Sequence, residues 1–219
     1  MKIGVFDSGR GGEFIAANLS QLLPELEFMV VNDHDNVPYG SRSEHEIIEL
    51  TDAAIQPLIT AKCPIIVIAC NTATMAAIHI LRKRYPHIEF IGTEPMIKPA
   101  AMSSQNRIVT MLATPHTIAS TRYQQLKHSH GNNVVIHEPD TTEWASHIEH
   151  GRVDAIDLEV VGKSVALGSD TIVLACTHYL ALIDNLSRRF PSVTVLEPSE
   201  AIANHLQKLV SRRERRLDD

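Results

Sequence analysis

Two of the three cysteines occupy matching positions along the chain and could act together as acid/base groups. Cys70 ends the run IIVIAC and Cys176 ends the run TIVLAC, and small polar residues follow each of them. A thiol beside the free amides of a helix N-terminus is expected to have a lowered pKa and to form a thiolate near neutral pH. Two such thiols on opposite faces of a carbon atom could invert it, because one removes a proton while the other delivers one. We therefore predict that Cys70 and Cys176 are a catalytic pair.

Other uses of the cysteines have less support in the sequence. Free cysteines are commonly buried in the core, and Cys63, which Pro64 follows directly, fits that interpretation. The chain has no Cys-x-x-Cys pair, so a dithiol redox centre or a zinc knuckle lacks its usual spacing. An acyl transfer through one nucleophile leaves the second cysteine without a role. A structural role for all three cysteines stays open, but the matching positions of two of them favour chemistry.

The elements that must hold these cysteines predict an α/β protein. Short β-rich runs such as KIGVFDS, PIIVIAC and DTIVLAC alternate with helical stretches of about 10 to 15 residues, which is typical of parallel sheets covered by helices. Ligands bind at the carboxyl ends of such strands, so the polar residues there should converge on one cleft. The polar residues at predicted strand ends are Asp7, Ser8, Asn71, Thr72, Thr114, Thr117, Thr177 and His178.

An internal similarity indicates two pseudo-symmetric lobes, each a mostly parallel sheet flanked by helices. Residues 65–95 resemble residues 171–198: each segment has a hydrophobic strand, Ala-Cys, a helix with a basic end, an aromatic-Pro turn and a strand that ends in Glu-Pro. Reuse of a common βαβ unit is the alternative explanation. We expect a first lobe of residues 1–97, joined by a C-terminal helix of about 198–219, and a second lobe of residues 98–197, with the active site in the cleft between them.

Composition excludes several classes of partner. The formal net charge of −6 over 219 residues gives no general attraction for nucleic acid or anionic lipid. No stretch approaches the roughly 18 to 20 apolar residues of a membrane helix, and the start MKIGVFDSG lacks the layout of a signal peptide. We expect a cytoplasmic protein that has neither nucleic-acid nor membrane partners.

Two patterns that could suggest a cofactor or a metal are better explained otherwise. The motif at residues 7–12 lacks the full GxGxxG spacing of a nucleotide-binding loop. Glu143, His147 and His150 fall on one helical face without a further ligand group, so we expect a surface helix and no metal. Two basic runs are interpreted as the C-terminal ends of helices, and we expect the second run to be solvated: residues 82–84 and 212–216.

Five motifs, in order along the chain, resemble those of glutamate racemases. They are FDSGRGG at 6–12, VPYGSRS at 37–43, ACNTA at 69–73, TPHTIASTRY at 114–123 and ACTHY at 175–179. The resemblance implies a two-lobed α/β fold and racemisation of glutamate by two thiols, without pyridoxal phosphate, another cofactor or a metal. It also implies that D-glutamate is supplied for peptidoglycan. A homodimer is compatible with a two-lobed enzyme of this size.

The resemblance also implies roles for individual residues. Cys70 and Cys176 correspond to the catalytic pair, and Asp7 and His178 are expected to assist them, with His178 tuning Cys176. Hydrogen bonds to the substrate carboxylate must supply much of the catalysis, because an amino-acid α-proton is far less acidic than a thiol. The residues expected to bind substrate are Asp7, Ser8, Pro38, Tyr39, Gly40, Ser41, Asn71, Thr72, Thr114, Thr117, Thr177 and His178.

Two segments depart from the glutamate-racemase pattern. Glu13 and Phe14 stand where the family usually has a Leu-Thr pair, and residues 137–151 lack the usual Cys-Pro with a following Val-Glu stretch. The second departure falls where the pocket is shaped, so aspartate racemisation is an alternative activity. Relatives that decarboxylate or isomerise with one cysteine are disfavoured by the retained pair. A catalytically weak paralogue that binds an amino acid is the alternative from another class.

Overall fold

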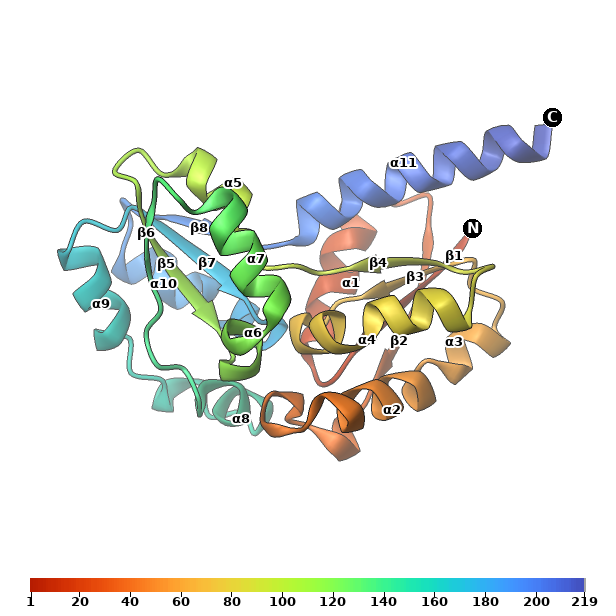
Figure 1. Cartoon of the computed structure of the whole chain (residues 1–219), viewed down its shortest axis with the longest axis horizontal. Coiled ribbons are helices and arrows are strands. Elements are labelled where there is room, and N and C mark those ends of the chain that lie inside the picture. Colours follow the sequence, from red (N-terminus) through yellow and green to blue (C-terminus); the bar gives the residue numbers. More distant parts are fainter. Residues whose placement is uncertain (219) are drawn as a thin grey trace.

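Two parallel sheets of four strands form the frame of the molecule (Figure 1). The computed structural model describes residues 1–218 and the side chains of residues 1–215. The first sheet has the order β2-β1-β3-β4 and the second has the order β6-β5-β7-β8, and every pairing is parallel. The strands are β1 Lys2–Asp7, β2 Glu27–Asn32, β3 Ile65–Ile68, β4 Glu89–Gly92, β5 Ile108–Ala113, β6 Val135–His137, β7 Thr171–Ala175 and β8 Thr194–Leu196. The repeated order confirms the expected pseudo-symmetric α/β architecture.

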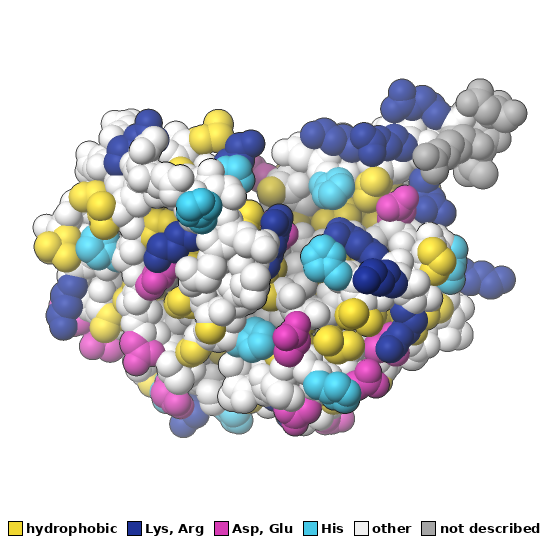
Figure 2. Space-filling model, viewed as in Figure 1, with side chains coloured by type: hydrophobic (Ala, Val, Ile, Leu, Met, Phe, Trp, Pro, Cys, Tyr) yellow, Lys and Arg dark blue, Asp and Glu magenta, His cyan; other side chains and the backbone are white. Residues whose placement is uncertain are grey.

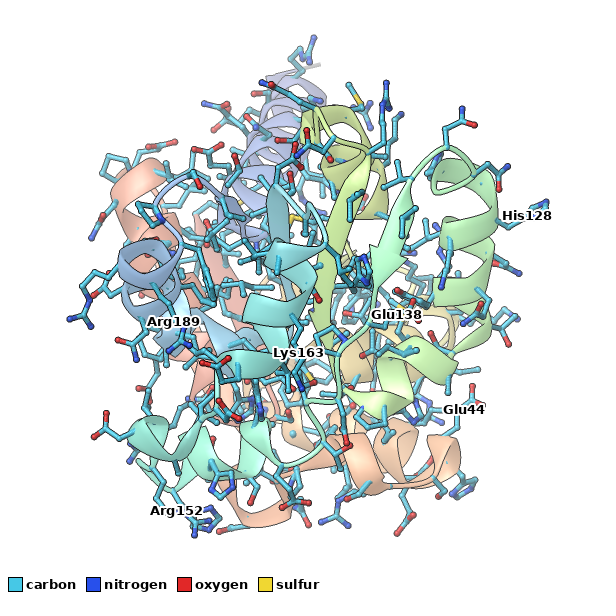
Figure 3. The ribbon with its side chains drawn as sticks, turned by 90° about the vertical axis from the view of Figure 1, so that its left-hand side faces the viewer. Glu44, His128, Glu138, Arg152, Lys163 and Arg189 are labelled. Atoms are coloured by element: carbon cyan, nitrogen blue, oxygen red, sulfur yellow. The ribbon has the colours of Figure 1, made fainter. Side chains whose placement is uncertain are left out.

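Helices cover the faces of both sheets (Figure 1). The α-helices are α1 Gly11–Leu22, α2 Glu44–Ala54, α3 Gln56–Thr60, α4 Asn71–Arg84, α5 Ile97–Ser103, α6 Pro115–Ala119, α7 Thr121–His130, α8 Trp144–Glu149, α9 Glu159–Ala166, α10 Ile183–Arg189 and α11 Ser199–Asp218. The 3-10 helices are η1 His34–Asn36, η2 Tyr39–Ser41, η3 Val153–Ala155 and η4 Thr177–Leu182. Figure 3 views the second lobe from its end, and the labelled His128, Lys163 and Arg189 project from its outer helices.

Local sequence explains where the elements near the cleft begin and end. All four residues of β3 are buried, as expected for a central parallel strand that lacks polar alternation. Ser43 and Glu46 form a capping box at the start of α2. The run of residues 82–84 lies in the last turn of α4, where cations interact favourably with the helix dipole, as predicted.

The C-terminal helix α11 lies beside the first lobe (Figure 1) and contacts α1. Asn18 of α1 donates a hydrogen bond of 3.0 Å to the hydroxyl of Ser199, the first residue of α11. Arg213 is half-buried and donates a hydrogen bond of 3.4 Å to the carbonyl of Pro64, so the run of residues 212–216 is not wholly solvated as expected. Figure 2 shows other Lys and Arg side chains along this helix. The side chain of Arg216 lies outside the described residues.

The lobes share part of their core. One buried apolar cluster contains Val5 and Leu19 from the first sheet and its helix, together with Leu174 and Tyr179 from the second half. Trp144 packs edge-on against Tyr179, with ring centroids 5.7 Å apart. We propose residues 1–97 with 198–219 as one lobe and 98–197 as the other; residue 219 lies outside the described residues.

Among residues 1–218, no helix combines the length and the apolar character that crossing a bilayer requires. The described residues also contain no group of three or more His, Cys, Asp or Glu side chains that could hold a metal ion. In the segment 143–150, whose histidines were considered as metal ligands, His150 directly follows α8, and its Nδ1 lies 2.8 Å from the carbonyl of Ser146.

Candidate active site

A small cavity lies between the lobes, at the carboxyl ends of the central strands. It encloses about 20 Å³, which is room for about one water molecule. Both Cys70 and Cys176 line it, and so do nine of the other residues predicted from the sequence. The lining residues are Ser8, Pro38, Tyr39, Gly40, Cys70, Asn71, Thr72, Thr114, Ala145, Cys176, Thr177 and His178.

Three of the predicted site residues do not line this cavity. Asp7 is fully buried behind it, and Thr117 is buried beneath Thr114, to whose hydroxyl its own hydroxyl lies 3.0 Å away. Ser41 is exposed at the end of η2. Asp7 and Thr117 are therefore supports of lining residues, whereas the structure does not bring Ser41 to the cavity.

Cys70 is held at the N-terminus of a helix, as predicted. It caps α4, its sulfur accepts a hydrogen bond from the Ala73 amide at 3.4 Å, and the Ser8 hydroxyl lies 3.2 Å from the sulfur. Burial, followed by the charge of Asp7, nevertheless raises the pKa of the Cys70 thiol to about 12. The expectation of a lowered pKa is wrong for this thiol, because desolvation outweighs the two hydrogen bonds.

Cys176 has different surroundings from Cys70. It follows β7, but the next element is the 3-10 helix η4, and the Cys176 side chain makes no capping hydrogen bond. The expected α-helix N-terminus at this thiol is therefore wrong. Its sulfur lies instead 3.8 Å from Nδ1 of His178, at the limit of a hydrogen bond to sulfur. The two thiols are thus matched in sequence but not in their partners.

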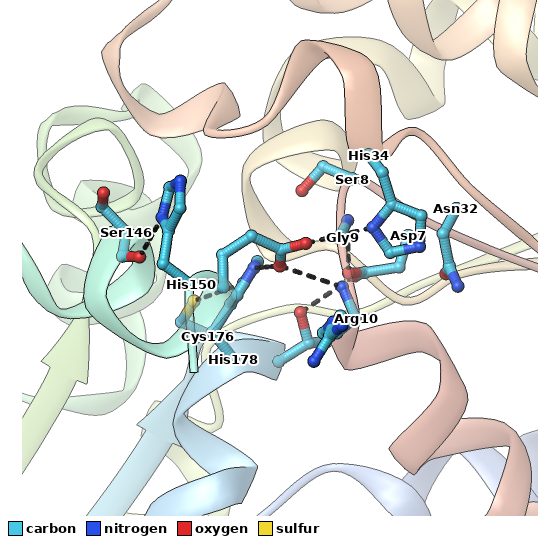
Figure 4. Close-up of polar contacts among 12 residues, drawn as sticks. Asp7, Ser8, Gly9, Arg10, Asn32, His34, Ser146, His150, Cys176 and His178 are labelled. Atoms are coloured by element: carbon cyan, nitrogen blue, oxygen red, sulfur yellow. Dashed lines mark hydrogen bonds and ion pairs between the residues drawn. The ribbon is translucent and has the colours of Figure 1, made fainter. Parts of the chain in front are cut away.

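His178 joins Cys176 to a largely buried carboxylate. Its Nε2 lies 2.7 Å from Oε2 of Glu149 (Figure 4). The His178 side chain is only 4% exposed. Burial opposes the charged ring, but the bonds to Cys176 and Glu149 prevail and raise the pKa of His178 to about 10. The hydrogen bond from His178 is the main reason why the pKa of Glu149 is lowered to about 2. An imidazolium therefore lies beside the Cys176 thiol.

Asp7 connects the lobes behind the cavity. Its carboxylate accepts hydrogen bonds from the Gly9 amide at 3.0 Å and from the Thr177 hydroxyl at 2.9 Å. Complete burial raises the pKa of Asp7, although the charge of His178 and these two donors oppose the shift. Gly11 is required here, because a Cβ at this position would lie 2.2 Å from the Thr177 side chain.

Polar groups of both lobes also meet at the other side of the cavity. The hydroxyls of Thr72 and Thr114 lie 3.2 Å apart across the interface. Both side-chain polar atoms of Asn71 are buried without a hydrogen-bond partner among the described residues. Buried amides are rarely left unpaired, so Asn71 is available to a ligand. Tyr39 is anchored by the bond of its hydroxyl to Asp33 at 2.7 Å, which fixes the loop that carries Gly40.

Similarity to known proteins identifies the family. The model of the family described as Asp/Glu/Hydantoin racemase matches residues 13–206, which is most of the chain. The chain belongs to this racemase family. A glutamate racemase of Ectopseudomonas mendocina is 35% identical to it, over 97% of this chain and 83% of that protein. The resemblance in the five motifs is therefore confirmed, as is the expected enzyme class, an isomerase similar to glutamate racemases.

Solved structures of racemases have the same fold. The Escherichia coli glutamate racemase, in complex with L-glutamate and the activator UDP-MurNAc-ala, has a TM-score of 0.82 and 29% identity over 96% of this chain and 82% of its own. The Francisella tularensis glutamate racemase, in complex with D-glutamate, has a TM-score of 0.78 and 28% identity over 97% of this chain and 81% of its own. These similarities confirm the two-lobed α/β fold.

One residue of this racemase-family site was missed by the sequence analysis. Glu149 ends α8, its side chain is 9% exposed, and it reaches His178 from a segment that was interpreted as a surface helix lacking the family's Val-Glu stretch. The available signal was the pair Ile148-Glu149, in which an apolar residue precedes Glu. The histidines on either side of this pair, His147 and His150, obscured the pattern, and only the fold brings Glu149 to the cleft.

Proposed function

We propose that the protein interconverts L- and D-glutamate by proton transfer between two thiols, without a cofactor. The observation that carries the proposal is that Cys70 and Cys176, from the two halves of the chain, line one cavity together with Asn71, which has no partner of its own. Two acid/base groups facing one small space are what inversion at a carbon atom requires. A single-thiol reaction would leave one of the two cysteines idle.

The reaction needs one thiolate and one thiol. The thiolate takes the α-proton, so the Cα–H bond breaks, an S–H bond forms, and the electron pair stays on the substrate as a carbanion. The other thiol then delivers its proton to the opposite face, which forms the new Cα–H bond and leaves a thiolate. Cys70 is held as a thiol by the pKa of about 12, so it suits the role of proton donor in the first turnover. Cys176, beside the His178 imidazolium, suits the role of base.

The remaining residues bind the substrate and stabilise the carbanion. The Asn71 amide, with the Thr72 and Thr114 hydroxyls, can hold the α-carboxylate, whose charge must be stabilised more strongly in the transition state than in the ground state. Ser8 and Thr177 can hold the ammonium group, and Asp7, behind the cavity, positions the Thr177 hydroxyl. The backbone of Pro38, Tyr39 and Gly40 can approach the substrate side chain closely.

A cavity of about 20 Å³ cannot hold glutamate, so the lobes must separate for the substrate to enter. The loop that carries Gly40 and the second lobe are in contact, since a Cβ on Gly40 would lie 3.3 Å from the Thr114 side chain. Closure over the substrate would exclude water from the carbanion. We also propose a cytoplasmic location, a role in supplying D-glutamate for peptidoglycan, and a homodimer as the assembly to be tested.

We propose glutamate rather than aspartate as the substrate because the relatives of about one-third identity are named glutamate racemases, among them the Ectopseudomonas mendocina enzyme at 35%. The test is to incubate the protein with L- or D-glutamate, or with L- or D-aspartate, in deuterated water. NMR then measures how fast the α-proton signal of each amino acid is lost. We expect exchange of both glutamate enantiomers with inversion, and slower exchange of aspartate. Exchange of aspartate alone would assign the alternative racemase activity. Binding of glutamate with no exchange would assign the amino-acid-binding paralogue and overturn the proposal.

A further inference from the structure

A chain of hydrogen bonds leads from the surface of the first lobe to the thiol of the second. Nδ1 of His34 lies 3.0 Å from Oε1 of Glu149, and Oε2 of the same carboxylate lies 2.7 Å from Nε2 of His178 (Figure 4). The other ring nitrogen of His178 lies 3.8 Å from the Cys176 sulfur. His34 is thus the outermost member of a chain that ends on a proposed acid/base group.

The Glu149 carboxylate is held from both lobes. The Arg10 amide of the first lobe donates to Oε2 at 3.2 Å, and this oxygen also contacts His178 of the second lobe. Among the described residues, His34 is the side chain that hydrogen-bonds to Oε1. The Glu149 side chain is 9% exposed, whereas that of His34 is 46% exposed. His34 therefore covers the carboxylate on its solvent side and fixes its rotation.

His34 is also part of the segment that closes the cavity. It begins η1, and the chain continues directly to Pro38, Tyr39 and Gly40, which line the cavity. An exposed ion pair usually contributes little to stability. A hydrogen bond to the almost buried Glu149 carboxylate can nevertheless fix the orientation of that carboxylate, which water would not do. When the lobes separate, the contact between His34 and Glu149 must break.

We propose that His34 is a positioning residue that holds the Glu149 carboxylate against His178 when the lobes are closed. It thereby couples closure of the segment before Tyr39 to proton transfer at Cys176. This inference rests on the proposed racemase function. His34 touches neither the substrate cavity nor a thiol, so its effect is confined to the Cys176 side of the reaction.

The test uses the difference between the two proton transfers. Because the equilibrium constant of a racemisation is one, kcat/KM must be equal in the two directions, but the isotope effects need not be. Slower transfer at Cys176 makes removal of deuterium by Cys176 more rate-limiting. The primary isotope effect then rises for the enantiomer that Cys176 deprotonates and falls for the other. Ser8→Ala, which removes the hydroxyl 3.2 Å from the Cys70 sulfur, should give the opposite asymmetry.

We expect His34→Ala to lower kcat about tenfold, because a small displacement of a catalytic group has a rate effect of this order. The isotope effects should change in the sense opposite to that in Ser8→Ala. His34→Asn keeps an N–H donor near the position of Nδ1 and should restore most of kcat and the parental isotope effects. His150→Ala is the matched control: this histidine directly follows α8, and among the described residues the hydrogen-bond partner of its ring is the Ser146 carbonyl, not Glu149. It should behave like the parent.

A second measurement does not depend on turnover. NMR titration of the His178 ring should show its midpoint at lower pH in His34→Ala, because a loosened Glu149 stabilises the imidazolium less, and no change in His150→Ala. Parental isotope effects and an unchanged His178 titration in His34→Ala would overturn the inference. So would an equal change for both enantiomers that His34→Asn fails to restore. Absence of glutamate turnover in the parent would instead reject the proposed function, and the titration would still decide the role of His34.

Discussion

The hydroxyl of Thr177, in the second lobe, donates a hydrogen bond of 2.9 Å to Oδ1 of Asp7, in the first. The carboxylate that accepts it is completely buried, so it depends on this donor and on the Gly9 amide for the hydrogen bonds that water would otherwise supply. The contact also joins the loops that follow β1 and β7, which carry Ser8 and Cys176. The Asp7 contact therefore ties the two halves of the site together.

Thr177→Val should destabilise the protein by about 1 to 3 kcal/mol, because a buried acceptor loses its partner while the side-chain volume is kept. The measurement is urea-induced unfolding at pH 7. Thr142→Val is the control, since the Thr142 hydroxyl bonds to the exposed Asp140 and should change the unfolding free energy by no more than about 0.5 kcal/mol. Equal stability of the two variants would contradict a structural role for the Asp7 contact.

Cys70→Ser and Cys176→Ser should each lower kcat for racemisation by a factor of about 100 to 10,000, which is the usual contribution of an acid/base group. A hydroxyl is far less acidic than a thiol and cannot replace it. Circular dichroism of the product mixture measures the rate in both directions. Cys63→Ala, which alters a buried cysteine outside the cavity, should retain activity. Full activity of either serine variant would show that the thiol is structural.

Alkylation of Cys70 should keep accelerating at high pH. Since burial raises its pKa to about 12, the thiolate fraction, and with it the rate, should rise about tenfold per pH unit through pH 10. An exposed thiol with a pKa of about 8.5 would instead level off near pH 9. The rate is measured with iodoacetamide and mass spectrometry in a variant that lacks Cys63 and Cys176. A plateau below pH 9 would contradict the dominance of burial.

Glu149→Gln should reduce stability in a pH-dependent way. The pKa of Glu149 is lowered to about 2, so its contribution is present above its unfolded pKa of about 4.5 and is lost as pH falls towards 2. The pKa of His178 is raised to about 10, so its contribution is present below about 6.5 and is lost as pH rises through 10. At pH 5 to 6 the stabilising contributions of Glu149 and His178 are both present.

We therefore expect the free energy of unfolding of Glu149→Gln to lie about 3 kcal/mol below that of the parent at pH 6, since an unpaired imidazolium would remain buried. The difference should shrink as pH falls towards 2. Glu159→Gln removes an exposed partner of Arg189 and is the control, with an expected change below about 1 kcal/mol. A difference between Glu149→Gln and the parent that does not change with pH would show that the carboxylate is not titrating as the structure indicates.

The sequence by itself was sufficient for the architecture and for most residues that line the cavity. Strands such as β3 are uninterrupted apolar runs, and the residues directly after them, such as Asn71 and Thr177, must lie at the carboxyl edge of a sheet whatever the rest of the fold is. The internal similarity around the two cysteines also predicts a repeated unit, because the same local pattern forms the same local structure. These features depend on neighbours along the chain.

Only the tertiary structure decided how the two thiols differ. The pKa of Cys70 depends on how much water the packed lobes exclude, and the N-cap position alone suggests the wrong direction. The partners of Cys176 come from distant segments: Glu149 reaches His178 from α8, and His34 reaches Glu149 from the first lobe. Desolvation and contacts across the interface are sums over atoms far apart in sequence, so no local pattern encodes them. The two cysteines, which match in sequence, therefore have unequal surroundings for a reason that only the packing of the lobes provides.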